Sequence, residues 1–474
     1  MKPITHQFGA NVRKALGDVT LQKALGRAKQ GFILKRSKAV EALPEFEAIR
    51  ATAKAIKDHT LAHLDHYLEK FEAQVAASGG QVHWAETPAD LARIVTEIAR
   101  TSGGRKVLKG KSMIGEEAEV NEALAEAGFE AIETDLGEYI IQLAHEPPSH
   151  IIAPAIHKTR EQIGDLFRKS HHDSRLGPQQ NEVAELVTEA RRVLRGHFVS
   201  GDVGITGGNF LVAETGSVVL VTNEGNGDLS ATLPRVHIVT ASIEKVVPTL
   251  EDATTMLRLL GRSASGQEMS VYTTLFTGPR RAEDPDGPNE FHVVLLDNGR
   301  SKMLGTEFQE MLRCIKCGAC LNHCPVYGTV GGHAYGWVYP GPMGSVLTPL
   351  MLGLKETRDL PNASTLCGRC EAVCPMSIPL PRMLRAHRTE QHRKGLDAQR
   401  QRFALMAWGF VARRPRLYRL LMGFNASVLA KAAGRTGRLS RLPFAKAWTF
   451  DRDLPAPQGQ GFVSAWHKQR GGSP

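Results

Sequence analysis

Seven cysteines in two short stretches constrain this chain of 474 residues more than any other feature. The first stretch, CIKCGACLNHCP, holds Cys314, Cys317, Cys320 and Cys324 with the spacing C-x2-C-x2-C-x3-C-P. Bacterial proteins with two iron-sulfur clusters use this spacing, and the fourth cysteine binds the other cluster. Three cysteines at two-residue gaps can wrap one face of a cubane cluster, whereas the fourth, which precedes a proline, points away. The pattern therefore predicts two clusters close together.

The second stretch, LCGRCEAVCP, holds Cys367, Cys370 and Cys374 with the spacing C-x2-C-x3-C-P. It matches the last three positions of the first motif, and Ser364 stands where the first cysteine would fall. If each motif lends its last cysteine to the other cluster, Cys374 belongs to cluster 1 and Cys324 to cluster 2. The predicted ligands are then Cys314, Cys317, Cys320 and Cys374 for cluster 1, and Cys324, Cys367 and Cys370 for cluster 2.

Cluster 2 lacks one cysteine, and three arrangements remain open for its fourth corner. It could be a [3Fe–4S] centre, a [4Fe–4S] cluster whose fourth iron binds Ser364, or a [4Fe–4S] cluster that binds water or an outside ligand. Zinc is the other metal to weigh, because two C-x2-C pairs can make a four-cysteine site. Seven cysteines and two C-P endings fit two iron-sulfur clusters far better than one zinc ion.

The order of predicted elements divides the chain into four regions. The first is rich in helix-forming residues. In the second, apolar runs such as QVHWA and GSVVLVTNE alternate with helical patterns, one of them capped by Thr87 with Asp90 three residues on. This alternation predicts an α/β domain with parallel strands. The regions are a helical N-terminal region (1–75), the α/β domain (76–300), the cysteine region (301–385) and a basic helical C-terminal region (386–474).

Three segments carry expectations of their own. Residues 116–128 predict one helix, and residues 130–144 predict a strand or extended chain. The 42 residues between the two cysteine stretches are rich in glycine, proline and aromatic residues. They could cover the clusters, offer a docking surface to a partner, or form an ordinary long loop.

The α/β region offers only weak candidates for chemistry. Its Gly-rich turns could cradle phosphate or carboxylate, but plain turns between strands are the stronger interpretation. Neither a dinucleotide-binding fingerprint nor a P-loop is present. Glu214, Glu224 and His237 are candidate acids and a candidate base, although ordinary strand-end roles fit each of them better. The run His171-His172-Asp173 is more typical of a solvated polar turn than of a metal site. The catalytic residues stay unknown.

The ends of the chain bear on location and partners. The N-terminal residues lack the apolar stretch of a signal peptide, so we expect a cytoplasmic protein, where disulfides are rare. The formal net charge is +10, but residues 391–474 carry +13 and the preceding residues carry −3. The Arg-studded apolar helix in this tail could lie peripherally on the inner membrane surface, pack on a partner subunit, or cover the cysteine region. We expect no nucleic-acid partner, because no recognised binding module occurs.

Four segments together resemble the lactate utilization protein B family. They are GITGGNFLVAETGSVVLVTNEGNGDLSATLPR, VVLLDNGR, CIKCGACLNHCPVYGTVGGHAYGWVYPGP and LCGRCEAVCP. The resemblance covers about residues 60–470. It implies an LUD domain with an α/β fold similar to sugar-phosphate isomerases and CoA-transferases, followed by an α-helical ferredoxin-like two-cluster domain. Ser364 in place of a cysteine looks like the family's own pattern.

The resemblance also implies a role. The family takes part in oxidising L-lactate to pyruvate, in a complex with a cysteine-rich lactate utilization protein and a lone LUD-domain protein. We therefore expect an iron-sulfur electron-transfer subunit of an L-lactate dehydrogenase-type complex. One alternative is an iron-sulfur subunit for another 2-hydroxy acid such as glycolate. Another is a binding protein that senses a metabolite or redox state. If an open iron of cluster 2 acted as a Lewis acid, the chain would itself be the enzyme.

Overall fold

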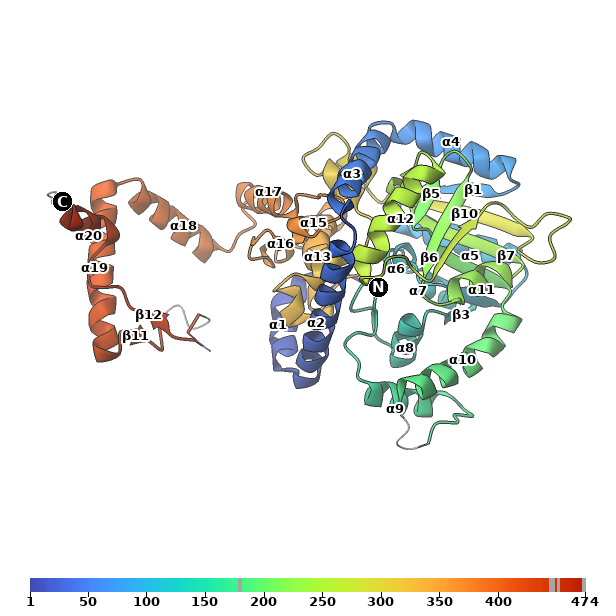
Figure 1. The fold of residues 1–474 in the computed structure, drawn as a ribbon, viewed down its shortest axis with the longest axis horizontal. Coiled ribbons are helices and arrows are strands. Elements are labelled where there is room, and N and C mark those ends of the chain that lie inside the picture. The colour runs from blue at the N-terminus through green and yellow to red at the C-terminus, as the bar shows by residue number, and fades with distance from the viewer. Residues whose placement is uncertain (178–180, 443–447, 450–451, 471–474) are drawn as a thin grey trace. The chain divides into compact units, whose positions relative to one another are not determined.

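The computed structural model describes residues 1–177, 181–442, 448–449 and 452–470. The chain forms two compact units, Met1–Gln391 and His392–Pro474 (Figure 1). The first unit holds the predicted α/β domain and the cysteine region. Residues 443–447, 450–451 and 471–474 of the predicted basic C-terminal region lie outside the described residues.

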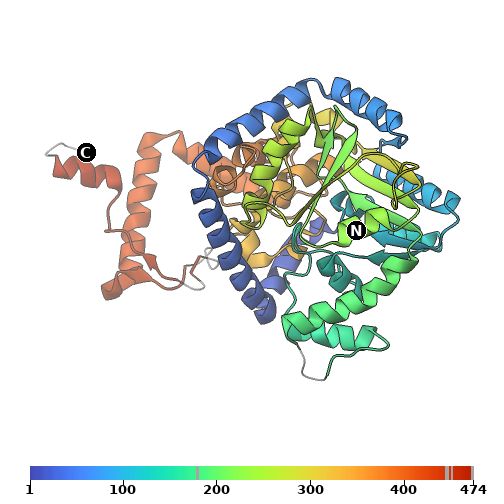
Figure 2. The same ribbon diagram turned by 45° about the vertical axis from the view of Figure 1, so that its right-hand side comes forward.

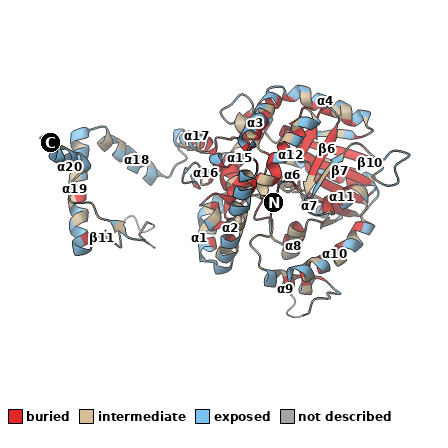
Figure 3. Ribbon diagram, in the orientation of Figure 1, coloured by how far each residue is buried: buried red, intermediate tan, exposed pale blue. Residues whose placement is uncertain are grey.

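A six-stranded parallel sheet forms the centre of the first unit, in the order β1-β10-β7-β4-β2-β3. Its middle strands are apolar and buried, as the red interior of Figure 3 shows, because helices and a second sheet cover its two faces. The predicted parallel α/β layer is confirmed. The strands are β1 (Gln81–Ala85), β2 (Lys106–Lys109), β3 (Glu130–Glu133), β4 (Val203–Gly207), β7 (Val236–Ser242) and β10 (Glu290–Leu296).

Helices and a second sheet cover the two faces of this sheet. On one face Leu91 and Val95 of α5 pack against Ile205 and Ile238. On the other face α4 packs with the second sheet, whose order is β8-β5-β6-β9. The elements are α4 (Leu64–Ala77), α5 (Pro88–Thr101), β5 (Phe210–Val212), β6 (Ser217–Thr222), α11 (Asn226–Thr232), η2 (Ile243–Lys245), β8 (Val246–Val247), α12 (Leu250–Ala264) and β9 (Tyr272–Phe276).

Local capping decides where several of these helices begin. Thr87 and Asp90 form the predicted capping box at the start of α5. Residues 130–144 were expected to be extended, and this is wrong beyond β3, because α8 (Leu136–Ala144) follows at once. The Asp135 side chain accepts a hydrogen bond from the Glu138 N–H and so starts α8 as its N-cap.

The helix expected over residues 116–128 is in fact two. They are α6 (Met113–Glu117) and α7 (Val120–Glu126), and they are separated at Glu119, whose φ of 55° is left-handed. A residue in that conformation cannot continue an α-helix. Two longer helices follow, α9 (Arg160–Ser170) and α10 (Val183–Ser200).

The N-terminal helices lie along the cysteine region, as Figures 1 and 2 show in blue beside orange. Arg36 of α2 donates to the Val373 carbonyl at 2.9 Å, and Arg50 of α3 donates to the Cys374 carbonyl at 2.8 Å. These helices therefore hold the second cysteine stretch in place. The helices before β1 other than α4 are η1 (Thr5–Gln7), α1 (Phe8–Gly17), α2 (Val19–Glu41) and α3 (Phe46–Ala62).

Short helices build the cysteine region. They are η3 (Ser301–Met303), η4 (Gln309–Arg313), α13 (Ala319–Asn322), α14 (Tyr327–Val330), η5 (His333–Tyr335), α15 (Gly341–Leu352), η6 (Leu360–Asn362), α16 (Arg369–Ala372) and α17 (Leu380–Arg393). The segment between the two cysteine stretches is folded and largely buried. Trp337, Tyr339 and Met343 from this segment belong to the same apolar core as Cys317 and Cys374.

The second unit exposes many large apolar side chains, among them Phe403, Trp408 and Phe424. No helix within the described residues is long and apolar enough to span a membrane. The elements of this unit beyond the end of α17 are α18 (Gln399–Ala412), α19 (Pro415–Ala433), η7 (Gly434–Thr436), β11 (Arg438–Leu439), β12 (Leu454–Pro455) and α20 (Phe462–Gln469).

Candidate iron-sulfur centre

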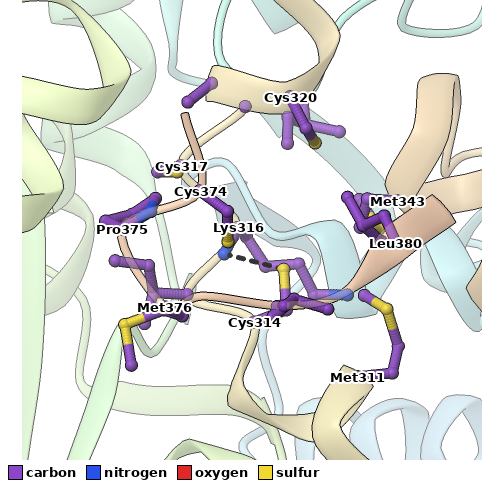
Figure 4. Close-up of a pocket in the computed structure, with 15 residues that line it drawn as sticks. Met311, Cys314, Lys316, Cys317, Cys320, Met343, Cys374, Pro375, Met376 and Leu380 are labelled. Carbon is purple, nitrogen blue, oxygen red and sulfur yellow. Dashed lines mark hydrogen bonds between the residues drawn. The ribbon is translucent and has the colours of Figure 1, made fainter. Parts of the chain in front are cut away.

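Four cysteines from the two separate stretches line one pocket. Cys314, Cys317 and Cys320 come from the first stretch, and Cys374 comes from the second (Figure 4). About 380 Å³ of space, part of it open to solvent, lies between the side chains of this pocket, and water-sized molecules can occupy about 20 Å³ of it. The remaining walls are mostly apolar, with Met311, Met343, Met376 and Leu380 among them. The donor set and the apolar shell fit a cluster held by four thiolates.

The backbone around Cys317 turns sharply so that the thiols can converge. Lys316 and Gly318 have φ of 57° and 72°, the left-handed conformation that reverses the chain locally. The Lys316 N–H donates to the Cys314 sulfur at 3.4 Å. Hydrogen bonds to cluster sulfurs are one of the ways in which a protein sets a cluster's reduction potential.

Burial disfavours the deprotonated, charged form of these cysteines unless a cation lies beside them. Burial raises the pKa of Cys317 to about 12, with a further contribution from the charge of Cys374. Burial likewise raises the pKa of Cys374 to about 11. Iron stabilises the thiolate form, because a coordinating thiol is deprotonated outright. The site is therefore suited to metal binding rather than to free thiol chemistry.

The other three cysteines, Cys324, Cys367 and Cys370, do not line this pocket. Cys324 and Cys370 are buried, whereas Cys367 is exposed. The pKa of Cys370 rises to about 12, first because of burial and then because of the charges of other cysteines, Cys324 among them. The pKa of Cys367 is lowered, chiefly by the Arg369 N–H.

Ser364 repeats the local geometry of Cys314. Leu366 and Gly368 have φ of 54° and 79°, which matches the left-handed pair that flanks Cys317. The Leu366 N–H donates to the Ser364 Oγ at 3.1 Å, as the Lys316 N–H does to the Cys314 sulfur. The serine oxygen therefore occupies the position that a sulfur occupies in the first stretch.

A buried ionic network joins the α/β domain to the cysteine region, and the sequence reasoning missed it. Arg300 donates to Glu117 at 2.7 and 2.9 Å, and its Nε lies 3.1 Å from a Glu244 oxygen. The Tyr339 hydroxyl donates to the same Glu117. The ammonium of Lys316 lies 4.0 Å from the centre of the Tyr339 ring. Nothing in the sequence around Arg300 indicated that it would join the two parts of the unit, because a single arginine after a strand is a common surface residue.

The weaker candidates have ordinary roles, with one exception. His237 is fully buried, its ring bonds to Thr206, and burial lowers its pKa to about 3, so it stays neutral. Glu214 accepts from the Leu250 N–H at the start of α12. His171 is buried and bonded to Tyr139 and Glu189, so the expected solvated turn is wrong at that residue. Glu224 is the exception, because it lines a cavity.

A site for one metal ion needs side chains closer together than a site for an iron-sulfur cluster does. Among the residues that the structure describes, no group of three or more His, Cys, Asp or Glu side chains is arranged to hold one metal ion.

Family models match both halves of the first unit. Residues 68–296 match the LUD domain, and residues 310–378 match the 4Fe-4S dicluster domain.

Full-length relatives extend these matches. The chain is 42% identical to the uncharacterized electron transport protein YkgF of Escherichia coli, over 99% of this chain and 98% of that protein. It is 42% identical to lactate utilization protein B of Bacillus licheniformis, over 99% and 98%, and 44% identical to that of Shouchella clausii, over 98% and 97%. A crystal structure of a DUF162 family protein from Deinococcus radiodurans matches 49% of this chain and 98% of that chain, with 13% identity and a TM-score of 0.28, too low to carry an argument.

Proposed function

The chain belongs to the lactate utilization protein B family, and on this premise we propose that it is the electron-transfer subunit of a complex that oxidises L-lactate to pyruvate. It is an iron-sulfur protein of lactate utilization, with an LUD domain followed by a 4Fe-4S dicluster domain. A bound cluster accepts and passes on single electrons. The observation that carries the proposal is the meeting of four cysteines from two distant motifs at one apolar pocket.

The ligands of the clusters follow from this meeting. We propose Cys314, Cys317, Cys320 and Cys374 for cluster 1, because these four line the pocket. Cys324, Cys367 and Cys370 remain for cluster 2, because they do not line that pocket. The LUD domain's likeness to sugar-phosphate isomerases and CoA-transferases stays a prediction.

The experiment that tests the function is anaerobic co-purification of the full chain with the family's two other lactate utilization proteins, followed by addition of L-lactate. Lactate should reduce the clusters of the assembled complex, as seen by EPR, and should leave the isolated chain oxidised. Glycolate is the comparison substrate. Reduction by glycolate in place of L-lactate would assign the chain to another 2-hydroxy acid, and reduction by neither would contradict electron transfer.

Ser364 is the proposed ligand at the fourth corner of cluster 2. Replacing Ser364 with cysteine should convert that corner to a thiolate, because the serine oxygen already has the local geometry of the Cys314 sulfur. We expect a changed EPR signal and a lower midpoint potential for cluster 2, with that of cluster 1 unchanged. Thr389→Cys places a thiol at an exposed position of α17, outside both cysteine stretches, and is the control. If both variants left cluster 2 as it is in the wild type, Ser364 would not be at the corner.

The C-terminal unit has a surface suited to a partner protein. In α18 the exposed Phe403, Met406 and Phe410 share one side of the helix, and the exposed Leu405 and Trp408 lie on the other. A helix that rests on a membrane has one apolar face, whereas a helix apolar on two sides is normally buried. We therefore propose protein contact ahead of membrane contact for this helix.

Changing two of these aromatic residues tests that surface. Phe403→Ser with Trp408→Ser should weaken co-purification with the partner proteins by at least about tenfold, because exposed aromatic anchors carry much of the energy of an interface. Arg400→Ser, on the same helix, should leave it unchanged. Unaltered co-purification together with lost binding to anionic vesicles would favour the membrane interpretation instead.

A further inference from the structure

The LUD domain contains a second and larger cavity, at the carboxyl ends of its central strands. About 1370 Å³ lies between its side chains, part of it open to solvent, and water-sized molecules can occupy about 300 Å³ of it. Gly110 follows β2, Gly207 ends β4 and Thr240 lies near the end of β7, and all three line the cavity. A cavity of this size is within the range of small-molecule sites.

The strand order also favours this place. From β2 the chain moves outward to the edge strand β3, and then returns to β4 and continues in the opposite direction through β7 and β10. The order therefore reverses between β2 and β4, where the cavity lies. In open α/β sheets, ligands bind outside the carboxyl ends of the strands at such a reversal.

The cavity shares a wall with the pocket of cluster 1. Ile151, Lys316 and Cys317 line both spaces. Cys317 is a proposed ligand of cluster 1, so a molecule in the cavity would lie one side chain away from the cluster. A ligand that donates electrons to cluster 1, or that changes its reduction potential, must lie this close to the cluster.

The polar lining selects the charge of that ligand. Lys111, Lys245 and Lys316 face the cavity, against two carboxyl groups, Asp135 and Glu224. The Lys111 ammonium is buried and has no hydrogen-bond partner in the protein. The lining is therefore net positive and has an ammonium in need of a partner.

We propose that this cavity binds a small carboxylate of the 2-hydroxy or 2-oxo acid class, next to cluster 1. The apolar wall of Ile151, Ile152 and Leu220 suits a short hydrocarbon group, and the ammonium groups suit the carboxylate. Binding should also act on the cluster. An added electron repels a neighbouring anion, so the reduced cluster 1 binds the carboxylate more weakly than the oxidised cluster does. The proposal rests on the proposed function, since it takes cluster 1 as present.

Calorimetry on the anaerobically purified full chain, with EPR-monitored redox titration, tests this site. L-Lactate and pyruvate should bind, and the uncharged analogue lactamide should not. Tenfold weaker binding to the reduced form would lower the midpoint potential of cluster 1 by about 59 mV at saturating carboxylate. Lys111→Gln and Lys245→Gln should each weaken binding by about tenfold or more, because each removes a charge-assisted hydrogen bond. Lys355→Gln, at an exposed position, is the matched control.

The outcomes separate this proposal from the function itself. Two intact clusters by EPR with no carboxylate binding would overturn the cavity assignment and leave the electron-transfer role standing. Loss of clusters from the wild type would contradict the electron-transfer role instead. Equal binding of lactamide, or tighter binding of inorganic phosphate than of either carboxylate, would also overturn the assignment. The two lysine variants lie on different elements, so a folding defect in one leaves the other as a test.

Discussion

Replacing Cys374 with alanine should abolish the EPR signal of cluster 1, although Cys374 belongs to the second cysteine motif. The reason is that Cys374 lines the same pocket as Cys314, Cys317 and Cys320. Cys367 and Cys370, which share its motif, do not line that pocket. Iron content of the anaerobically purified protein should fall by about four per chain, the content of one cubane cluster. EPR and iron analysis of the same sample measure both effects.

The matched variant is Cys324→Ala, the last cysteine of the first motif. It should spare cluster 1 and abolish cluster 2, because Cys324 does not line the pocket of cluster 1 and is a proposed ligand of cluster 2. The crossed assignment would be wrong if Cys374→Ala and Cys367→Ala removed the same EPR signal. It would also be wrong if Cys324→Ala removed the signal lost in Cys317→Ala.

Replacing Arg300 with glutamine should destabilise the first unit by about 3–5 kcal/mol, the usual cost of breaking a buried ion pair. Arg300 is 1% exposed, and its removal leaves the buried Glu117 and Glu244 without their cation. Arg258→Gln is the control, because Arg258 pairs with Glu45 at an exposed position and its loss should have little effect on stability. Melting followed by far-UV circular dichroism compares the two.

The deficit of the Arg300 variant should depend on pH. Burial alone would raise the pKa of Glu244, but Arg300, Lys316 and Lys245 outweigh it and lower that pKa from 4.5 to about 2. In the wild type this carboxylate adds stability above pH 4.5, and the contribution is lost as the pH falls toward 2. Without Arg300, the pKa of Glu244 should rise, and protonation then relieves the unpaired charge. The variant should therefore be closer to the wild type at pH 5 than at pH 8, and a deficit that grows with acid would contradict this explanation.

Part of the fold followed directly from local patterns. The parallel strands, the α5 helix and its Thr87–Asp90 capping box were predictable. Hydrophobic periodicity and helix capping both depend on residues within a few positions of one another in the chain. The extended chain expected over residues 130–144 failed because Asp135 caps a helix immediately after a short strand. A strand-like apolar run and a buried helix cannot be distinguished by composition alone.

The sequence by itself determined that this protein is built to hold iron-sulfur clusters. Ligand spacing within a short loop is local, so C-x2-C-x2-C-x3-C-P specifies which residue types face a cluster. Even the position of Ser364 could be read from the spacing.

Only the tertiary structure decided what surrounds those clusters. The pairing of Arg300 with Glu117, and the wall formed by Ile151, Lys316 and Cys317, join residues that lie far apart in the chain. Such contacts depend on how a parallel sheet, the N-terminal helices and the cysteine region pack together. Packing is a property of the whole core, and no short stretch of sequence carries it.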